Sequence, residues 1–130
     1  MEFTNMDHIT INVVDLEKTL WFYGELLELK SLPLVEFETE TIYYFQLPGL
    51  IKLELIDYKN KSEKHELNGL ERGIFRHLAF NCDNVFEVED LLTKHGFPFH
   101  VPVSFNEKLG FYGGLTKDPN GVELEFLQYK

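Results

Sequence analysis

Hydrophobic and polar residues alternate near the N-terminus with the two-residue period of a β-strand that is covered on one side. His8, Thr10 and Asn12 fall on the polar side of this predicted strand. Residues 16–27 then carry leucine and tyrosine at helical spacing, after Asp15, whose carboxylate suits a helix N-cap. The chain therefore opens with a strand that presents a histidine, followed by a helix of about three turns.

Three more strands are predicted in the first half of the chain. Residues 32–38, 41–47 and 50–58 are rich in β-branched and aromatic side chains. The breaks between them are short, and one holds a proline-glycine pair, which favours an antiparallel meander. Residues 59–73 are charged and contain two glycines, so we expect a surface connection there.

The second half begins with the same plan. Alternation over residues 76–81 predicts a strand with His77 on one side, and Arg76 is expected to point to the other side. Asn84 suits the N-cap of a following helix, and Gly96 is the residue expected to stop that helix. A strand and a helix are thus predicted in the order found in the first half.

Three strands complete the second half. Residues 97–103 contain two prolines, so they can form only an edge or irregular strand. Residues 111–117 and 122–129 read as two strands joined by the turn sequence DPNG. The second half thus repeats the order strand, helix and three strands.

The spacing of polar residues supports an internal repeat. His77 follows His8 by 69 residues, and Glu125 follows Glu54 by 71 residues. We therefore expect an α+β fold of two βαβββ modules in tandem. The predicted organisation is a single domain, residues 1–130, made of repeat 1 (residues 1–58), repeat 2 (residues 74–130) and the connection between them (residues 59–73).

Each half supplies one histidine on its first strand and one glutamate on its last strand. If the halves pair about a local twofold axis, two imidazoles and two carboxylates converge. Such a set suits Ni, Co, Zn, Mn or Fe and leaves positions for water or substrate. The predicted ligands of this divalent metal are His8, Glu54, His77 and Glu125.

Composition narrows the classes of function. The formal net charge of −10 argues against a nucleic-acid partner and an anionic membrane surface. No apolar run approaches the roughly 18 residues of a membrane span. The N-terminus shows no basic, hydrophobic leader, and the single cysteine, Cys82, can form no internal disulfide. We therefore expect a cytoplasmic protein.

Three stretches carry a family resemblance: DHITINVVDLEKTLWFYGELL at the start, RHLAFNCDN in the middle and DPNGVELEF near the end. Together they resemble the vicinal oxygen chelate superfamily, also called the glyoxalase/bleomycin resistance/dioxygenase superfamily. The resemblance implies that the two modules form a curled, mixed-sheet cup around a divalent metal. It also implies a small-molecule substrate and a homodimer.

The ligand pattern is most similar to that of glyoxalase I, or lactoylglutathione lyase. His8, Glu54, His77 and Glu125 stand where that enzyme keeps its four ligands. The resemblance implies proton abstraction next to a carbonyl of a small α-hydroxycarbonyl or thiol-hemithioacetal substrate. Glu125 or Glu54 would be the catalytic base, with the resemblance favouring Glu125, and a low-molecular-weight thiol would be a co-substrate.

Two positions depart from bacterial glyoxalase I. Asn12 stands where that enzyme has an arginine, and Tyr58 where it has an asparagine, so groups suited to glutathione are missing. The identity of the thiol stays open. Two alternatives also stay open: a thiol transferase of the fosfomycin-resistance type, for which Thr10 would contact a phosphonate, and a non-catalytic small-molecule binding protein.

Residues for the substrate pocket are predicted from their strands. Tyr43, Phe45, Phe111 and Tyr112 are aromatic strand residues that would suit the wall of a cup. His100 is expected to have a structural or surface role. The predicted pocket residues are Thr10, Asn12, Phe45 and Tyr112.

Overall fold

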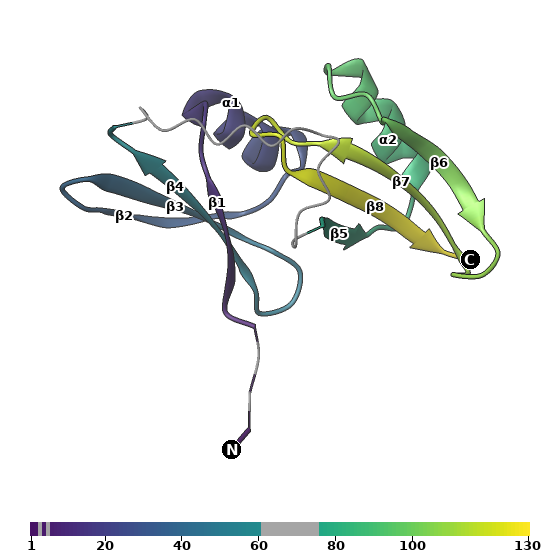
Figure 1. Cartoon of the computed structure of the whole chain (residues 1–130), viewed down its shortest axis with the longest axis horizontal. Helices are drawn as coiled ribbons and strands as arrows, with labels where there is room; N and C mark the ends of the chain where they lie inside the picture. The colour runs from purple at the N-terminus through teal and green to yellow at the C-terminus, as the bar shows by residue number, and fades with distance from the viewer. Residues whose placement is uncertain (3, 5, 61–75) are drawn as a thin grey trace. The chain divides into compact units, whose positions relative to one another are not determined.

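The computed structural model describes residues 1–130 except 3, 5 and 61–75 (Figure 1). The chain divides into two compact units, Met1–Glu66 and Leu67–Lys130. Each unit contains one four-stranded mixed sheet and one helical segment, which confirms the predicted α+β class and the tandem βαβββ order. Most of the predicted connection lies outside the described residues.

The first unit follows the predicted meander. Its strand order is β1-β4-β3-β2, with β2, β3 and β4 antiparallel and β1 parallel to β4. The helix α1 continues directly into a π-helix, η1, and the pair spans most of the predicted helical stretch. The elements are β1 (His8–Asn12), α1 (Leu16–Leu20), η1 (Trp21–Leu26), β2 (Ser31–Glu36), β3 (Glu40–Gln46) and β4 (Lys52–Tyr58).

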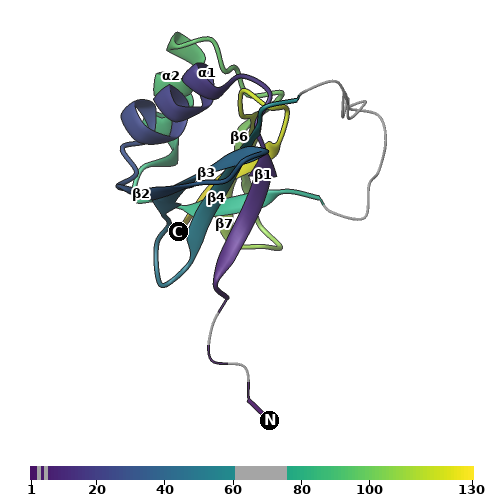
Figure 2. The ribbon, with the colours of Figure 1, turned by 90° about the vertical axis from the view of Figure 1, so that its left-hand side faces the viewer.

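The start of α1 matches the expectation from sequence. Asp15 is the N-cap, and its side chain accepts a hydrogen bond from the Lys18 backbone N–H at 3.1 Å. In η1, a Cβ atom added at Gly24 would lie 3.2 Å from the ring of Phe45, a residue of β3. Glycine therefore allows the helical segment to approach the sheet closely. The segment lies on one side of this sheet (Figure 2).

The second unit has the strand order β5-β8-β7-β6, again with one parallel pair, β5 and β8. Asn84 caps α2 through the Glu87 backbone N–H, and Gly96 follows the helix with a φ of 92°. Both observations confirm the predicted bounds of this helix. The elements are β5 (Leu78–Asn81), α2 (Val85–Lys94), β6 (Val101–Asn106), β7 (Phe111–Lys117) and β8 (Glu123–Tyr129).

The edge strand β6 begins later than predicted. The hydroxyl of Thr116 donates to the carbonyl oxygens of Phe97 and Pro98. The backbone of these two residues is therefore held by a side chain and not by the backbone hydrogen bonds of a strand pair. The register with β7 then shifts between Val101 and Ser104, around Pro102. The predicted edge position is confirmed, whereas the predicted range 97–103 is wrong because only its last three residues join the strand.

Each helical segment packs on one side of its own sheet. In the first unit, Leu53 and Leu55 of β4 are fully buried together with Phe22 of η1. In the second unit, Leu92 of α2 and Leu124 of β8 are fully buried. The opposite side of each sheet carries the glutamate of its predicted ligand pair. Among the described residues, no helix is long and apolar enough to cross a membrane.

Candidate functional site

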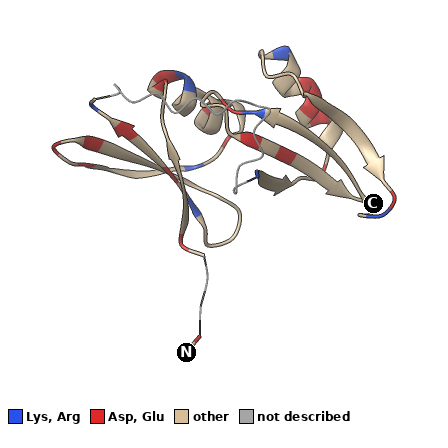
Figure 3. Cartoon of the chain, viewed as in Figure 1, with Lys and Arg blue, Asp and Glu red and all other residues tan. Residues whose placement is uncertain are grey.

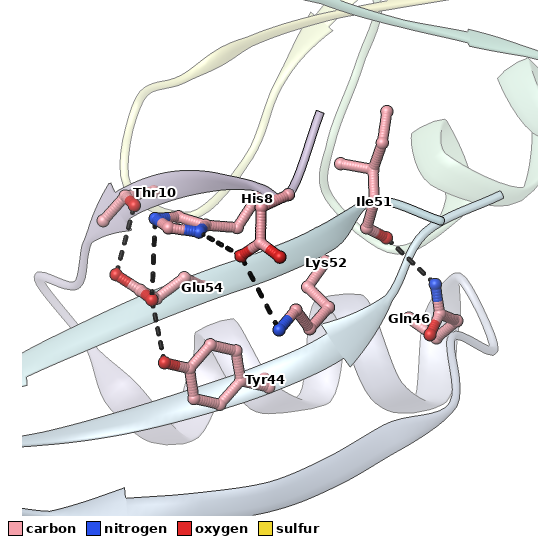
Figure 4. A network of polar contacts seen from close by, with 8 residues as sticks. His8, Thr10, Tyr44, Gln46, Ile51, Lys52 and Glu54 are labelled. Carbon is pink, nitrogen blue, oxygen red and sulfur yellow. Dashed lines mark hydrogen bonds and ion pairs between the residues drawn. The ribbon is translucent and has the colours of Figure 1, made fainter. Parts of the chain in front are cut away.

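The first predicted ligand pair forms within the first unit. Thr10 of β1 lies directly across from Glu54 of β4, so His8, two residues earlier, lies on the same side of the sheet as Glu54. The Nε2 atom of His8 lies 3.8 Å from Oε2 of Glu54 (Figure 4). The Glu54 side chain is 13% exposed and that of His8 is 41% exposed.

Two hydroxyl groups hold the carboxylate of Glu54. Thr10 Oγ1 donates to Oε1 at 3.2 Å, and the phenol of Tyr44 donates to Oε2 at 2.8 Å (Figure 4). This hydrogen bond raises the pKa of Tyr44, and burial raises it further. Tyr44 was missed from the sequence, although its place opposite Glu54 follows from the register of β3 on β4.

The other ring nitrogen of His8 contacts a second carboxylate. His8 Nδ1 lies 2.7 Å from Oδ2 of Asp7, and the Lys52 ammonium lies 3.7 Å from the same oxygen. The pKa of Asp7 is lowered, mainly by the hydrogen bond with His8 and then by the charge of Lys52. His8 therefore has a carboxylate near each nitrogen.

The second predicted pair forms within the second unit. Ala79 of β5 lies across from Glu125 of β8, and His77 precedes Ala79 by two residues. His77 Nε2 lies 2.8 Å from Oε2 of Glu125. The side chains of His77 and Glu125 are 27% and 18% exposed, so this pair is more enclosed than an ordinary surface contact.

Glu123 is a further acidic residue at this pair that the sequence reasoning did not select. Its Oε1 contacts the Arg76 guanidinium and lies 3.7 Å from His77 Nδ1, while its Oε2 lies 3.5 Å from His100 Nε2. The expectation that Arg76 points away from the His77 side is wrong, because regular alternation begins only at Leu78. His100, expected to be structural or surface-exposed, adjoins the same group.

The separation of the two atoms in each pair can be compared with the spacing of ligands around a metal ion. Ligand bonds of about 2.0–2.1 Å at right angles place neighbouring ligand atoms about 2.9 Å apart. The 2.8 Å separation in the second unit matches that spacing. The 3.8 Å separation in the first unit is wider. Within each unit, the described residues offer no set of three or more such ligands.

Acidic side chains mark the strands of both units, and basic ones are fewer (Figure 3). The whole chain carries 22 acidic and 12 basic residues. This excess of negative charge favours the approach of a cation over that of an anion.

The predicted pocket residues divide between the two sides of their sheets. Thr10 and Asn12 share the side of Glu54. Phe45 lies across from buried Leu53, on the helix side, where it lines an open depression of about 340 Å³. Phe45 therefore does not lie on the glutamate side of its sheet.

Tyr112 lies across from Gln128, whose side chain accepts a hydrogen bond from the first backbone N–H of α2. Tyr112 therefore lies on the helix side of its sheet and not on the side of Glu125. Phe111, one residue earlier, falls on the side of Glu125. On that side a Cβ atom added at Gly113 would lie 3.5 Å from Oε1 of Glu125. The Phe111 ring would lie nearer still, at 2.9 Å, so an aromatic ring adjoins the carboxylate here.

The chain is similar to a known protein family over most of its length. The family model described as Glyoxalase/Bleomycin resistance protein/Dioxygenase superfamily matches residues 5–126. No curated protein matched the chain. The matched region contains both histidine–glutamate pairs.

Three solved structures illustrate the similarity. A glyoxalase family protein from Enterococcus faecalis is 25% identical, with 98% of this chain and 99% of that chain covered and a TM-score of 0.74. The trypanothione-dependent glyoxalase I of Leishmania major is 26% identical, with 97% and 87% covered and a TM-score of 0.73. TnmS3, an antibiotic-binding protein from Streptomyces sp. CB03234, is 18% identical, with 100% and 99% covered and a TM-score of 0.75, which shows a shared fold alone.

Proposed function

Because the chain belongs to the glyoxalase/bleomycin resistance protein/dioxygenase superfamily, we propose that it is a metal-dependent lyase or isomerase of the glyoxalase I type. The observation that carries the proposal is the same histidine–glutamate pair in both units, on matched strands. One divalent ion of Ni, Co, Zn, Mn or Fe would take both pairs, within one chain or between the two chains of a homodimer. The proposed ligands are His8, Glu54, His77 and Glu125.

The reaction proposed is a proton transfer between neighbouring carbons. When bound, the ion would supply Lewis acidity, which would make the proton beside the substrate carbonyl more acidic. Glu125 removes that proton and returns it to the adjacent carbon. The substrate is a small α-hydroxycarbonyl compound or the hemithioacetal of a low-molecular-weight thiol.

The surroundings of the glutamates favour Glu125 as the base. Both carboxylate oxygens of Glu54 accept hydrogen bonds from hydroxyl groups, which hold Glu54 in the orientation of a fixed ligand. In the part of the chain that the structure describes, no hydroxyl group hydrogen-bonds Glu125.

The proposal is tested with metal-free protein that is reconstituted separately with each of the five metals. Each sample is assayed with methylglyoxal and a panel of thiols, including glutathione and trypanothione, for thioester formation. We expect turnover with at least one metal and none without metal. Uptake below about half an equivalent of every metal, together with no turnover, would refute the proposal.

A non-catalytic binding protein is the second candidate. The open depression of about 340 Å³ beside η1 supports it, because its lining is largely apolar. The fosfomycin-type alternative receives less support, because the Thr10 hydroxyl already donates to Glu54. Saturable binding of an apolar small molecule by metal-free protein would favour the binding protein.

A further inference from the structure

We propose that Asp7 and Glu123 are positioning residues. Each accepts a hydrogen bond from the Nδ1–H group of its histidine, His8 or His77, and so leaves the Nε2 atom of that ring free for the metal. This inference rests on the proposed function, because it concerns the same ligands. It adds two carboxylates that neither bind the ion nor touch the substrate. Each carboxylate acts on the Nδ1 atom of its histidine.

The tautomer of a histidine decides which nitrogen can bind a metal. A neutral imidazole carries one N–H group and one lone pair, so binding through Nε2 requires the proton on Nδ1. A carboxylate next to Nδ1 stabilises that tautomer and fixes the plane of the ring. The question for each histidine is therefore which acceptor lies beside Nδ1.

In the first unit, the required contact is already made. His8 Nδ1 lies 2.7 Å from Asp7 Oδ2. An ionised carboxylate can only accept, so Nδ1 is the donor. Nε2 then presents its lone pair on the side of Glu54, whose nearest oxygen is 3.8 Å away, beyond hydrogen-bond distance. His8 thus has the tautomer that binds metal.

The second unit shows the opposite arrangement. His77 Nε2 lies 2.8 Å from Glu125 Oε2, which places the proton of a neutral ring on Nε2. Its Nδ1 atom is buried and has no hydrogen-bond partner among the described residues. Metal binding at Nε2 requires the proton to be on Nδ1. The Oε1 atom of Glu123 lies 3.7 Å from Nδ1, and this carboxylate is the group that can accept a hydrogen bond from it.

Both proposed acceptors are held by cationic or imidazole side chains. Arg76 contacts Oε1 of Glu123, and His100 Nε2 lies 3.5 Å from its Oε2. Lys52 lies 3.7 Å from the oxygen of Asp7 that contacts His8. These neighbours hold each carboxylate in place beside its histidine.

Nitrogen-15 NMR of the imidazole rings tests the proton positions directly. In metal-free protein we expect His8 as the Nδ1–H tautomer and His77 as the Nε2–H tautomer. With one equivalent of Zn²⁺, both rings should carry Nδ1–H. A Zn²⁺-bound His77 without a proton on Nδ1 would overturn the inference.

Zn²⁺ affinity measured by competition with a chelator provides the second readout. Asp7→Ala and Glu123→Ala should each weaken Zn²⁺ binding about 10- to 100-fold, the usual effect of losing such a partner. Asp7→Asn and Glu123→Gln keep an oxygen acceptor and should recover part of the loss, which also covers the case in which an alanine variant folds poorly. Glu25→Ala and Asp90→Ala remove exposed acidic charges from the two units and serve as controls.

The outcomes separate this inference from the proposed function. If the folded Ala variants bind Zn²⁺ within about threefold of wild type, the positioning role is refuted and the metal site stands. If wild-type protein binds none of the five metals, the proposed function fails. In that case a loss of the His8 Nδ1–H tautomer in Asp7→Ala would still support the contact with Asp7, and an unchanged tautomer would refute it.

Discussion

Glu54 and Glu125 occupy matched positions on β4 and β8, but their neighbours differ. Glu54 accepts hydrogen bonds from Thr10 and Tyr44, whereas Glu125 lies 2.8 Å from the His77 ring. A repeat in sequence therefore does not produce two equivalent carboxylates. The difference gives the two residues separate predicted phenotypes.

The two glutamate-to-glutamine variants should differ in kind. Glu125→Gln should lower kcat about 10²- to 10⁴-fold even at saturating metal, because it removes the proposed base as well as a ligand. Glu54→Gln should mainly weaken metal binding, because it removes an anionic ligand. Both variants should remain folded by circular dichroism. Wild-type activity in both would contradict the assigned site.

The raised pKa of Tyr44 gives a prediction for metal-free protein. Glu54→Gln removes the charged acceptor, so the tyrosinate absorbance of Tyr44 should appear at lower pH, nearer the ordinary value of about 10. A raised pKa means that Tyr44 stabilises the fold below its unfolded pKa and loses this effect as pH rises through the folded pKa. Tyr44→Phe should remove that loss. An identical titration in wild type and Glu54→Gln would contradict the hydrogen bond.

At the residue scale, the sequence predicted which histidine and glutamate lie together better than it predicted the positions of the aromatic pocket residues. Alternation places His8 and Glu54 together once β1 pairs with β4. The same alternation places Phe45 on the helix side and Tyr44 on the ligand side, but the strand is aromatic at both positions. Since both sides of β3 carry aromatic residues, composition could not show which side faces the helix.

At the element scale, caps and turns made the boundaries predictable. Asp15 and Asn84 cap their helices as expected, and the DPNG turn closes on Gly121 with a φ of 86°. The π-helix η1 could not be predicted, because its hydrophobic spacing resembles that of an ordinary helix. The start of β6 was missed because it depends on the Thr116 hydroxyl, a contact from a distant part of the sequence.

The close spacing of β6 and β7 predicts a difference between two adjacent glycines. A Cβ atom at Gly114 would lie 2.9 Å from the Val101 carbonyl oxygen and 2.7 Å from the ring of Phe99. Gly114→Ala should therefore lower the free energy of unfolding by about 1–3 kcal/mol, as overpacking does. Denaturant titration measures this loss.

Gly113→Ala is the matched control in the same strand. Its nearest neighbour, at 2.9 Å, is the outer part of the Phe111 ring, a side chain that is not buried and can move aside. The loss of stability should be smaller than that of Gly114→Ala. Equal losses would show that the backbone of β6 does not limit the spacing.

At the scale of the whole molecule, the central question is whether one ion takes both pairs. Each unit supplies two ligands, and two protein ligands alone rarely hold a divalent ion firmly. A shared ion therefore makes the two units depend on each other energetically. The same dependence arises within one chain or between the chains of a homodimer.

A double-mutant cycle on His8→Ala and His77→Ala tests this dependence. Zn²⁺ at about 100 times its Kd should stabilise wild-type protein by about 2.7 kcal/mol, the difference in unfolding free energy with and without metal. If one ion takes both pairs, either substitution should remove most of this stabilisation, and the double variant should lose little more. Two ions per chain, with losses that add, would instead show that each pair binds metal independently, and the shared centre would be wrong.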